Sequence, residues 1–422
     1  MWKNTYQKKN NLLATIATMN LLDSQQSAIK HLNEWRVGAL FMEAGTGKTR
    51  VAVDIANDTP CDLIVWMGPL QTLRRTILPT SVIDEINRWG GFRAPVEYVG
   101  VESLQNSDRI YLNLRSRIEQ AKNPFLIVDE SLKIKNAEAK RTKRIMDMSN
   151  LSTYKLILNG TPITRNLLDL KPQMDFLSPL ILNMSDAEFK NTFCEYKRVT
   201  KSFGGRKQYT KEFITGYENI DYLYSLIRHY VYEYDLKLSV KQLYNDISYT
   251  LSHDHFQEYV RLKEKYLDDE MMQWKNNNIF LEMTQKMQHT YSCTEDKFVK
   301  LDELFTEIDP ERTIIFCKYV DSQEQCRKRF PKSTVLSYQK NSLGLNLQHL
   351  CNTVYFDKNW DYALRIQSGR RTFRTGQEYD CRYWDLTGNV GLERLIDTNI
   401  SKKTSMAEYF KGKTKQEIYE AL

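Results

Sequence analysis

The 422-residue sequence has no Cys-x-x-Cys pair and no apolar run near the roughly 18 residues that a membrane helix needs. Its seven cysteines are scattered and odd in number, which argues against a disulfide framework and a zinc site and fits a reducing cytosol. The first 20 residues begin with basic side chains but lack a clean apolar block, so we expect no signal peptide. These absences predict a cytoplasmic protein without a membrane partner.

The sequence also has no internal repeats, and its composition is that of an ordinary globular protein, with 41% hydrophobic and 27% charged residues. Its length exceeds that of one ordinary core, which predicts two domains. The net charge of +7 is compatible with a nucleic-acid partner. Six Lys or Arg residues crowd each of the segments 133–144 and 197–211, either as nucleic-acid contacts or as solvated charged faces.

Short apolar runs that end in glycine, proline or acidic residues fill the first third of the chain. They lie at 39–42, 62–68, 125–130 and 154–160. Stretches with helical character, such as 49–58 and 137–148, fall between them. Such runs predict buried parallel strands whose carboxyl ends carry function, and thus a doubly wound α/β lobe.

The pattern changes after residue 178. Two strand-like arms flank Gly204 and Gly205, which predicts a hairpin, and the tyrosine-rich residues 220–234 indicate a helix. Residues 253–308 contain no glycine or proline and predict helices. A second α/β segment and a helical tail are then expected from the apolar runs 312–320, 333–338 and 353–357 and from residues 391–422.

Residues 42–49, MEAGTGKT, follow an apolar run and open a helical stretch, which is the context of a phosphate loop. Gly45, Thr46 and Gly47 would let backbone N–H groups turn toward the phosphates of a nucleotide. Lys48 would reach the β- and γ-phosphates, and Thr49 would ligate Mg²⁺. Met42 stands where the strict pattern has glycine.

Asp129 and Glu130 end the apolar run 125–128, so two carboxylates are expected at the carboxyl edge of a parallel strand. Asp129 would hold Mg²⁺ through its coordination shell, and Glu130 would orient and deprotonate the attacking water. An acidic surface turn is the alternative, which the position after the phosphate loop disfavours. Another apolar run ends in Asn159-Gly160-Thr161-Pro162. These residues would either sense the γ-phosphate or form a turn without a role in binding.

Arg371 and Arg374 lie three residues apart, so both side chains can share one helical face. Arginines supplied by a second lobe stabilise the charge that develops in phosphoryl transfer. A solvated basic helix is the alternative for this pair.

The order of these segments resembles that of superfamily 2 helicases, in particular the SNF2-like branch. The matching segments are LDSQ for the glutamine motif, AGTGKT for motif I, VDESLKIKN for motif II, LILNGTPITRNLLDL for motif III, IIFCKYV for motif IV, NSLGLNLQ for motif V and QSGRRTFRTGQ for motif VI. The resemblance implies two RecA-like lobes with parallel sheets that close on ATP with Mg²⁺ and translocate along DNA.

The resemblance also assigns residues to these tasks. Gln25 would read adenine, and Gln367, Arg371 and Arg374 would act from the second lobe. DNA contact or its coupling to hydrolysis would involve Gly160, Thr161, Gly344 and Asn346. Basic residues of the predicted hairpin, Lys201, Arg206 and Lys207, would contact DNA as a pin or wedge, or belong to a packed surface hairpin.

The expected domains are lobe 1 at 1–177, a helical and hairpin insertion at 178–251, lobe 2 at 252–390 and a helical tail at 391–422. Lobe 2 is expected to be abbreviated, because only residues 322–332 separate two of its apolar runs. Motif II reads Asp-Glu-Ser-Leu, so Leu132 stands where the family often has histidine. This compactness resembles bacteriophage or bacterial members, which predicts a place in bacterial or phage-infected host cytoplasm.

The function expected from this resemblance is that of an ATP-hydrolysing, monomeric DNA helicase or translocase. It would act on duplex, forked or branched DNA, in fork remodelling or branch migration alongside replication or recombination proteins. A hydrolysis-impaired DNA-binding regulatory module and an RNA helicase are the alternatives.

Overall fold

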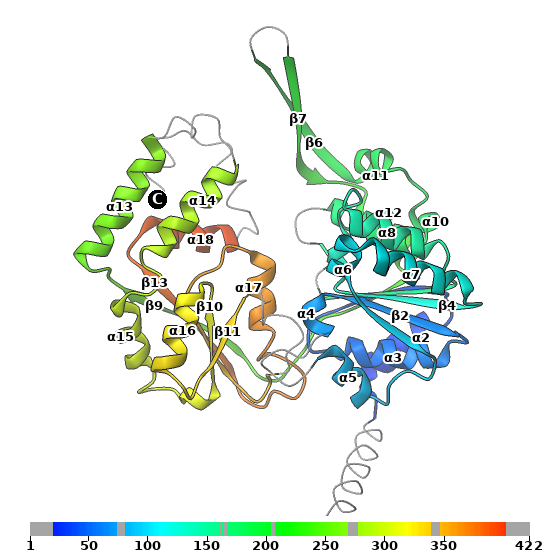
Figure 1. Cartoon of the computed structure of the whole chain (residues 1–422), viewed down its shortest axis with the longest axis horizontal. Helices are drawn as coiled ribbons and strands as arrows, with labels where there is room; N and C mark the ends of the chain where they lie inside the picture. Colours follow the sequence, from blue (N-terminus) through cyan, green and yellow to red (C-terminus); the bar gives the residue numbers. More distant parts are fainter. Residues whose placement is uncertain are drawn as a thin grey trace, which may run out of the picture. The chain divides into compact units, whose positions relative to one another are not determined.

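The structure is a computed structural model that describes residues 20–73, 81–160, 162–163, 167–203, 207–268, 277–338 and 347–401. The chain divides into two compact units, Met1–Leu236 and Lys237–Leu422, and each is built on its own parallel sheet (Figure 1). Helices pack against both sheets. The predicted α/β class, with two lobes that are each built on a parallel sheet, is confirmed.

All strand pairs of the first unit's main sheet are parallel. The order across the sheet is β3 (Val96–Gly100), β2 (Leu63–Gly68), β4 (Pro124–Asp129), β5 (Tyr154–Asn159), β1 (Val37–Met42) and β8 (Val231–Tyr234). Central strands such as β2 are buried along their whole length, since helices cover both faces of the sheet. The sequence runs predicted four of these strands to within two residues.

The helices of the first unit form two layers, each with its own hydrophobic core (Figure 1). One layer contains α2 (Asp23–Leu32), α3 (Lys48–Asp58) and α5 (Val82–Arg88). The other contains α6 (Val101–Asn106), α7 (Asp108–Gln120), α8 (Lys140–Ser149), α9 (Lys171–Leu177), α10 (Pro179–Leu182), α11 (Asp186–Phe193) and α12 (Ile220–Ile227). Shorter elements are α4 (Leu70–Leu73) and the 3-10 turns η1 (Ser131–Ile134) and η2 (Leu167–Asp169).

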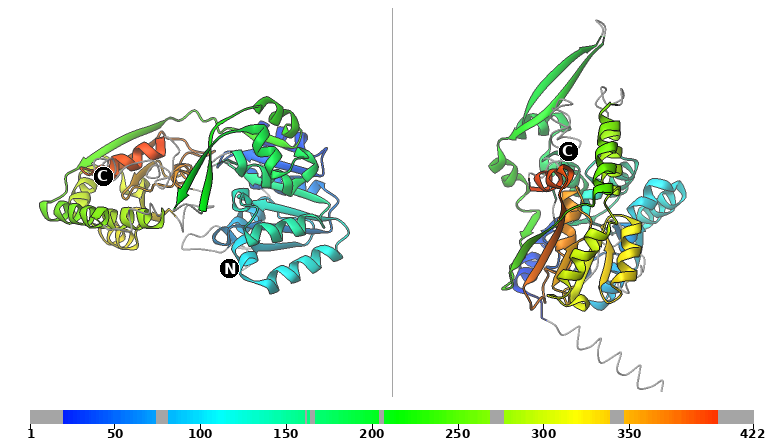
Figure 2. Two further views of the ribbon diagram at one scale, coloured as in Figure 1. Left: turned by 90° about the horizontal axis from the view of Figure 1, so that it is seen from above. Right: turned by 90° about the vertical axis from the view of Figure 1, so that its left-hand side faces the viewer.

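A long antiparallel hairpin stands away from these helices of the first unit (Figures 1 and 2). Its strands are β6 (Cys194–Phe203) and β7 (Lys207–Tyr217), paired from Phe203 opposite Lys207 to Cys194 opposite Tyr217. The predicted hairpin is therefore confirmed, although its two turn glycines lie outside the described residues.

The second unit has a parallel sheet with the order β11 (Thr334–Ser337), β10 (Thr313–Cys317), β12 (Asn352–Tyr355), β13 (Cys381–Gly388) and β9 (Gln242–Tyr249). A hydrophobic core lies between one face of this sheet and the helices α13 (His253–Asp268), α14 (Asn277–His289), α15 (Glu295–Leu304), α16 (Val320–Arg329) and α18 (Gly391–Ser401). The turn η4 (Pro310–Arg312) precedes β10. None of the helices in the described ranges is long and apolar enough to cross a membrane.

The other face of this sheet carries a row of aromatic rings under α17 (Tyr362–Gly369). Tyr244 stacks on Tyr383 at 4.8 Å, Tyr383 on Tyr355 at 6.5 Å, and Tyr355 on Phe316 at 5.8 Å between ring centroids. The Tyr383 hydroxyl donates to the Gly369 carbonyl at 3.0 Å. The row therefore supports the end of α17 through both ring packing and a hydrogen bond.

A buried ion pair stands at the carboxyl edge of the second sheet. Lys297 Nζ lies 2.8 Å from Asp357 Oδ1, and the two side chains are 2% and 1% exposed. The other oxygen of Asp357 accepts the Lys318 backbone N–H at 3.0 Å. One carboxylate thus ties α15 to the segments that follow β10 and β12.

Two expectations about organisation differ from the structure. The segment 220–234 was expected to be helical, but α12 ends at Ile227 and β8 then joins the first sheet beside β1. The expected start of lobe 2 at residue 252 falls after β9, whereas the two units divide between Leu236 and Lys237. The physical reason is that β9 pairs with β13 over eight residues and so belongs to the second sheet.

Between α16 and β12 the described residues contain the strand β11, and the abbreviation of the second lobe stays a prediction.

Hydrogen bonds hold both ends of the segment that passes from one unit to the other. Within the first unit, the Glu43 carboxylate accepts the Leu236 backbone N–H at 2.8 Å. Within the second unit, the Lys241 N–H donates to Asp380 Oδ1 at 2.7 Å. The crossing segment is therefore short, since only residues 237–240 lie between these two attached positions.

Candidate active site

The predicted phosphate loop connects β1 to α3 at the carboxyl edge of the first sheet. Gly45 and Gly47 have φ angles of 88° and 86°, in the left-handed region that glycine adopts without steric cost. The Thr46 hydroxyl donates to the Glu43 carbonyl at 2.7 Å and closes the turn. The loop leads directly into the N-terminus of α3, where the backbone N–H groups of the first turn and the helix dipole favour an anion.

Lys48 lies in the first turn of α3 and reaches back into the loop. Its ammonium group donates to the carbonyl oxygens of Met42 at 2.6 Å and Glu43 at 3.1 Å. A phosphate oxygen is a stronger acceptor for this cation than a neutral carbonyl. The position of Lys48 therefore fits the predicted binding of a nucleotide's phosphates.

Gln25 lies beneath the loop and is 5% exposed. Its amide nitrogen donates to the Thr46 carbonyl at 3.0 Å, and its amide oxygen accepts the Leu22 N–H at 3.1 Å. A Cβ atom on Gly47 would lie 2.2 Å from the Gln25 nitrogen, so a larger residue there would displace this amide from its hydrogen bond to Thr46. The observed contacts of Gln25 hold the loop, and its reading of adenine stays a prediction.

Asp129 and Glu130 stand at the carboxyl end of β4, in the same sheet. Burial, and next the charge of Glu130, raise the pKa of Asp129 to about 7, while the nearby Lys48 opposes this shift. The charge of Glu85 on α5 also raises this pKa, and no sequence pattern predicts that Glu85 lies near this site. A buried carboxylate with a raised pKa beside a lysine is typical of a functional site.

The residues present fit a magnesium ion bound together with phosphates. Thr49 and Asp129 offer the hard oxygen ligands that Mg²⁺ prefers, and such sites use one or two protein oxygens with phosphates and waters. Among the described residues, no group of three or more His, Cys, Asp or Glu side chains is placed to hold a metal without a nucleotide.

Gly160 follows β5 and packs against the phosphate loop. A Cβ atom at this position would lie 3.3 Å from the Ala44 nitrogen and 3.5 Å from the Met42 oxygen. This places the start of the predicted motif III beside the loop, whereas contact of Gly160 with DNA stays a prediction.

The structure does not describe the side chains of several other residues that are predicted to contact DNA. Thr161, Arg206, Gly344 and Asn346 lie outside the described residues. Lys201 and Lys207 belong to the strands β6 and β7, but their side chains lie outside the described parts.

The motif VI residues lie in the second unit, and one expectation about them is wrong. Helix α17 carries Gln367 but ends at Gly369, so Arg371 and Arg374 lie in the following turns and not on a helical face. The helix stops where Gly369 approaches the aromatic row, with a Cβ there only 3.3 Å from the Tyr355 hydroxyl. Arg371 is 4% exposed, so a solvated basic helix does not describe it.

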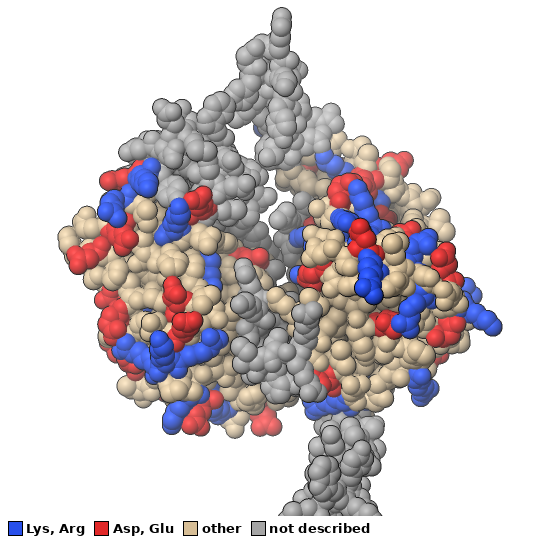
Figure 3. All heavy atoms as spheres, viewed as in Figure 1, with Lys and Arg blue, Asp and Glu red and all other residues tan. Residues whose placement is uncertain are grey.

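The basic segment 133–144 is largely engaged in ion pairs within the first unit. These pairs are Lys133 with Glu102 (3.5 Å), Lys135 with Asp169 (3.6 Å), Lys140 with Asp108 (3.0 Å), Lys143 with Glu138 (2.6 Å) and Arg144 with Asp108. Figure 3 shows acidic and basic side chains intermixed on the viewed face of this unit. The segment therefore does not form a purely positive patch.

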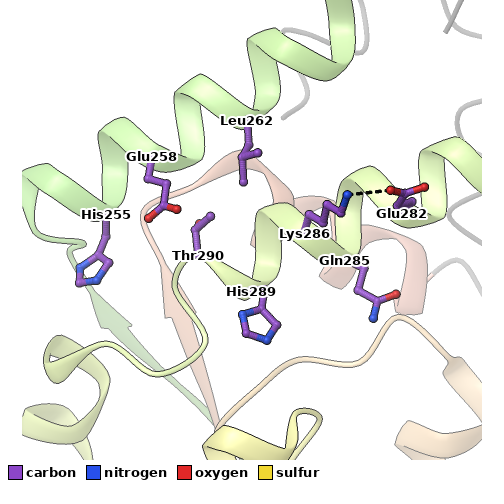
Figure 4. Close-up of a pocket in the computed structure, with 8 residues that line it drawn as sticks. All are labelled: His255, Glu258, Leu262, Glu282, Gln285, Lys286, His289 and Thr290. Atoms are coloured by element: carbon purple, nitrogen blue, oxygen red, sulfur yellow. Dashed lines mark ion pairs between the residues drawn. The ribbon is translucent and has the colours of Figure 1, made fainter. Parts of the chain in front are cut away.

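A groove of about 540 Å³ lies between α13 and α14 of the second unit (Figure 4). Its walls include His255, Glu258 and His289, together with the Lys286–Glu282 ion pair at 2.7 Å. None of the predicted nucleotide-binding residues lines it.

Comparison with protein families matches residues 99–330 to the SNF2-related domain, and this match covers more than half of the chain. The chain belongs to the SNF2-related family. The predicted resemblance to the SNF2-like branch is thereby confirmed at the level of the family.

Individual SNF2-related relatives are distant and much longer. Transcription regulatory protein SNF2 of Saccharomyces cerevisiae is 23% identical over 93% of this chain, which spans 28% of that protein. Chromatin structure-remodeling complex protein SYD of Arabidopsis thaliana is 23% identical over 83% of the chain and 12% of its own length. An uncharacterized ATP-dependent helicase of Mycoplasma genitalium is 23% identical over 75% of the chain and 35% of its own length.

Among solved structures, a Sulfolobus solfataricus SWI2/SNF2 ATPase core in complex with dsDNA is similar to this SNF2-related chain. The sequence identity is 17%, the match covers 95% of this chain and 94% of that one, and the TM-score is 0.43.

Proposed function

We propose that this chain is an ATP-driven motor that acts on DNA. The observation that carries the proposal is the site on the first sheet, where Lys48 in a glycine-rich phosphate loop lies near the buried carboxylate of Asp129. Membership of the SNF2-related family adds support for DNA as the partner. A phosphate-binding loop after β1 and an acidic pair at the end of β4, at the same edge of one sheet, are the parts that ATP hydrolysis needs.

In the proposed reaction, Lys48 and the loop N–H groups bind the β- and γ-phosphates of ATP. Thr49 and Asp129 would hold Mg²⁺, which would neutralise charge on the phosphates. Glu130 orients the attacking water and accepts its proton. Arg371 and Arg374 of the second unit, with Gln367, counter the charge that develops on the transferred phosphoryl group.

The direct test measures ATP hydrolysis by purified protein with and without duplex DNA. We expect DNA to stimulate hydrolysis, and we expect Lys48→Ala to lower the stimulated rate by roughly 100-fold or more. Equal hydrolysis with and without DNA would refute the motor. ATP binding without hydrolysis in a single-turnover measurement would indicate the regulatory module instead, and stronger stimulation by RNA would indicate an RNA helicase.

A narrower form of the proposal is that the motor remodels forks or drives branch migration in a bacterial or phage setting. The β6–β7 hairpin supports this form, because it stands away from the helices of the first unit and its sequence is basic with aromatic neighbours. Hydrolysis should then be stimulated more by forked and four-way DNA than by plain duplex or single strands. Equal rates on all four substrates would contradict a junction preference.

The proposed DNA contacts can be tested with the same substrates. Substituting the hairpin residues Lys201, Arg206 and Lys207 by alanine should weaken DNA binding uniformly across sequences and make it less dependent on salt. Gly344 and Asn346 are proposed to couple DNA to hydrolysis, so an Asn346→Ala variant should lose stimulation by DNA more than basal hydrolysis. Unchanged stimulation would remove Asn346 from this proposal.

A further inference from the structure

A buried amide on α9 connects three segments around the proposed active site. Gln173 has no exposed surface. Its amide oxygen accepts a hydrogen bond from the Ser131 hydroxyl at 2.5 Å. Its amide nitrogen donates to the carbonyl oxygens of Pro162 at 2.7 Å and Asp169 at 2.8 Å. Both N–H groups and the oxygen of the Gln173 amide therefore have hydrogen-bond partners. The backbone carbonyls of Pro162 and Asp169 can only accept, so they fix which side of the amide carries the nitrogen.

The first of these partners adjoins the proposed catalytic base. Ser131 is fully buried and follows Glu130 directly. Glu130 has a φ angle of 54°, a backbone conformation that residues with a Cβ rarely adopt and that surrounding contacts must maintain. The Leu132 side chain is apolar and cannot form a hydrogen bond. In the two residues after Glu130, the side-chain hydrogen bond therefore comes from the Ser131 hydroxyl, which donates to Gln173.

The other partners belong to the segment after β5. Asn159 donates its amide nitrogen to the Ser131 hydroxyl at 3.2 Å, and Gly160, the next residue, packs on the phosphate loop. Pro162, whose carbonyl Gln173 binds, follows two residues later. The Gln173 side chain thus binds both Ser131, which follows the proposed base, and Pro162, whose segment packs on the phosphate loop. These hydrogen bonds hold the two segments in a fixed position relative to each other.

We propose that Gln173 is a positioning residue for Glu130. It holds Ser131, and through Ser131 the left-handed turn that aims the Glu130 carboxylate at the attacking water. This inference rests on the proposed ATP hydrolysis. A shift of about 1 Å in a catalytic group can lower a rate by about 100-fold, so loss of this support should appear in kcat.

The test compares Gln173→Leu with a matched variant of the same helix, Met174→Ala. Met174 is also fully buried, but its side chain belongs to the hydrophobic core of the first unit and its substitution leaves a cavity. Gln173→Leu should lower kcat by 10- to 100-fold and leave the Kd for ATP within about twofold of wild type. Met174→Ala should lower the melting temperature but keep kcat within about twofold at temperatures where it is folded.

A pH profile separates positioning from general structural support. In Gln173→Glu, a neutral carboxylic acid restores one donor and one acceptor, whereas the carboxylate can only accept. The kcat of this variant relative to wild type should therefore rise as pH falls from 8 to 6, and Gln173→Leu should show no such change. If Gln173→Leu does not fold, Ser131→Ala takes its place and should lower kcat in the same direction.

The inference is overturned if Gln173→Leu, or Ser131→Ala in its place, keeps kcat within twofold. It is also overturned if Met174→Ala lowers kcat equally, or if the Gln173→Glu ratio does not change with pH. Failure of the proposed function looks different, since wild-type protein would then hydrolyse no ATP or hydrolyse it equally with and without DNA.

Discussion

Replacing Lys297 by methionine would leave the Asp357 carboxylate without its cation in the core of the second unit. Both side chains are at least 98% buried, and their charged atoms lie 2.8 Å apart. Breaking a buried pair by removing one partner costs about 3–5 kcal/mol, because the remaining charge is desolvated without compensation. Methionine keeps most of the apolar stem of lysine, so the loss should come from the charge more than from a cavity.

The expected loss is large beside the roughly 5–15 kcal/mol that stabilises a typical protein. For a unit of this size, each kcal/mol shifts the melting temperature by about 2–4 °C, so Lys297→Met should lower it by roughly 6–20 °C. Calorimetry on the full chain can measure this shift in the transition that responds to the substitution. Lys332→Met provides the control, since Lys332 pairs with Glu311 at 3.3 Å on the surface and should shift the midpoint by less than about 3 °C.

The double variant Lys297→Met/Asp357→Asn tests the cause. Asparagine removes the charge but keeps an oxygen that can accept the Lys318 backbone N–H, so the double variant should recover at least half of the lost stability. A single-variant loss under about 1 kcal/mol, or a double variant as unstable as the sum of the two single variants, would refute the reasoning.

Two further predictions concern the phosphate loop and a buried lysine. Gly47→Ala should weaken nucleotide binding, because its Cβ would lie 2.2 Å from the Gln25 amide nitrogen and push it off the Thr46 carbonyl, in addition to the strain of a φ of 86°. Gly90→Ala, with a φ of 95° and no atom within 4 Å, should carry the backbone strain alone, about 1–2 kcal/mol. Equal effects in calorimetry and nucleotide titration would contradict the steric argument. Burial lowers the pKa of Lys318 to about 7, well below its unfolded value near 10.4. Since the unfolded state then binds more protons between those values, stability should rise with pH above 7, by at most about 1.4 kcal/mol per unit. Urea unfolding from pH 6.5 to 9 should show this gain over Lys318→Met, and a constant difference would refute it.

The phosphate loop and most strands of the first sheet could be predicted from the sequence, because short runs of neighbouring residues determine them. The strand β1 is a continuous apolar run, since helices cover both of its faces, and the glycines that follow it are required by positive φ angles. The acidic pair could be placed beside the loop because the carboxyl ends of parallel strands share one edge of the sheet.

The edge strand β9 escaped prediction for the opposite reason. Most of its residues are partly or fully exposed, so Gln242–Tyr249 shows no apolar run, and only its pairing with β13 makes it a strand. The segment was accordingly assigned to the insertion and not to the second sheet.

The remaining differences between the sequence predictions and the structure arise from tertiary contacts. The three-residue spacing of Arg371 and Arg374 suits a helix, but α17 ends where Gly369 meets the rings of Tyr355 and Tyr383. The lysines and arginines of 133–144 look like a nucleic-acid patch in sequence, yet their acidic partners come partly from 102–108 and 169. Gln173 likewise gave no signal, because its importance comes from three segments that meet only in the fold.

The segment that crosses from one unit to the other has a short maximum length. Leu236 is attached to Glu43 in the first unit, and Lys241 to Asp380 in the second. A fully extended chain covers at most about 3.6 Å per residue, so these two attachment points can lie no more than roughly 18 Å apart while both hydrogen bonds persist. In the proposed motor, a movement of one unit relative to the other would therefore have to be taken up within residues 237–240 or break one of these two hydrogen bonds.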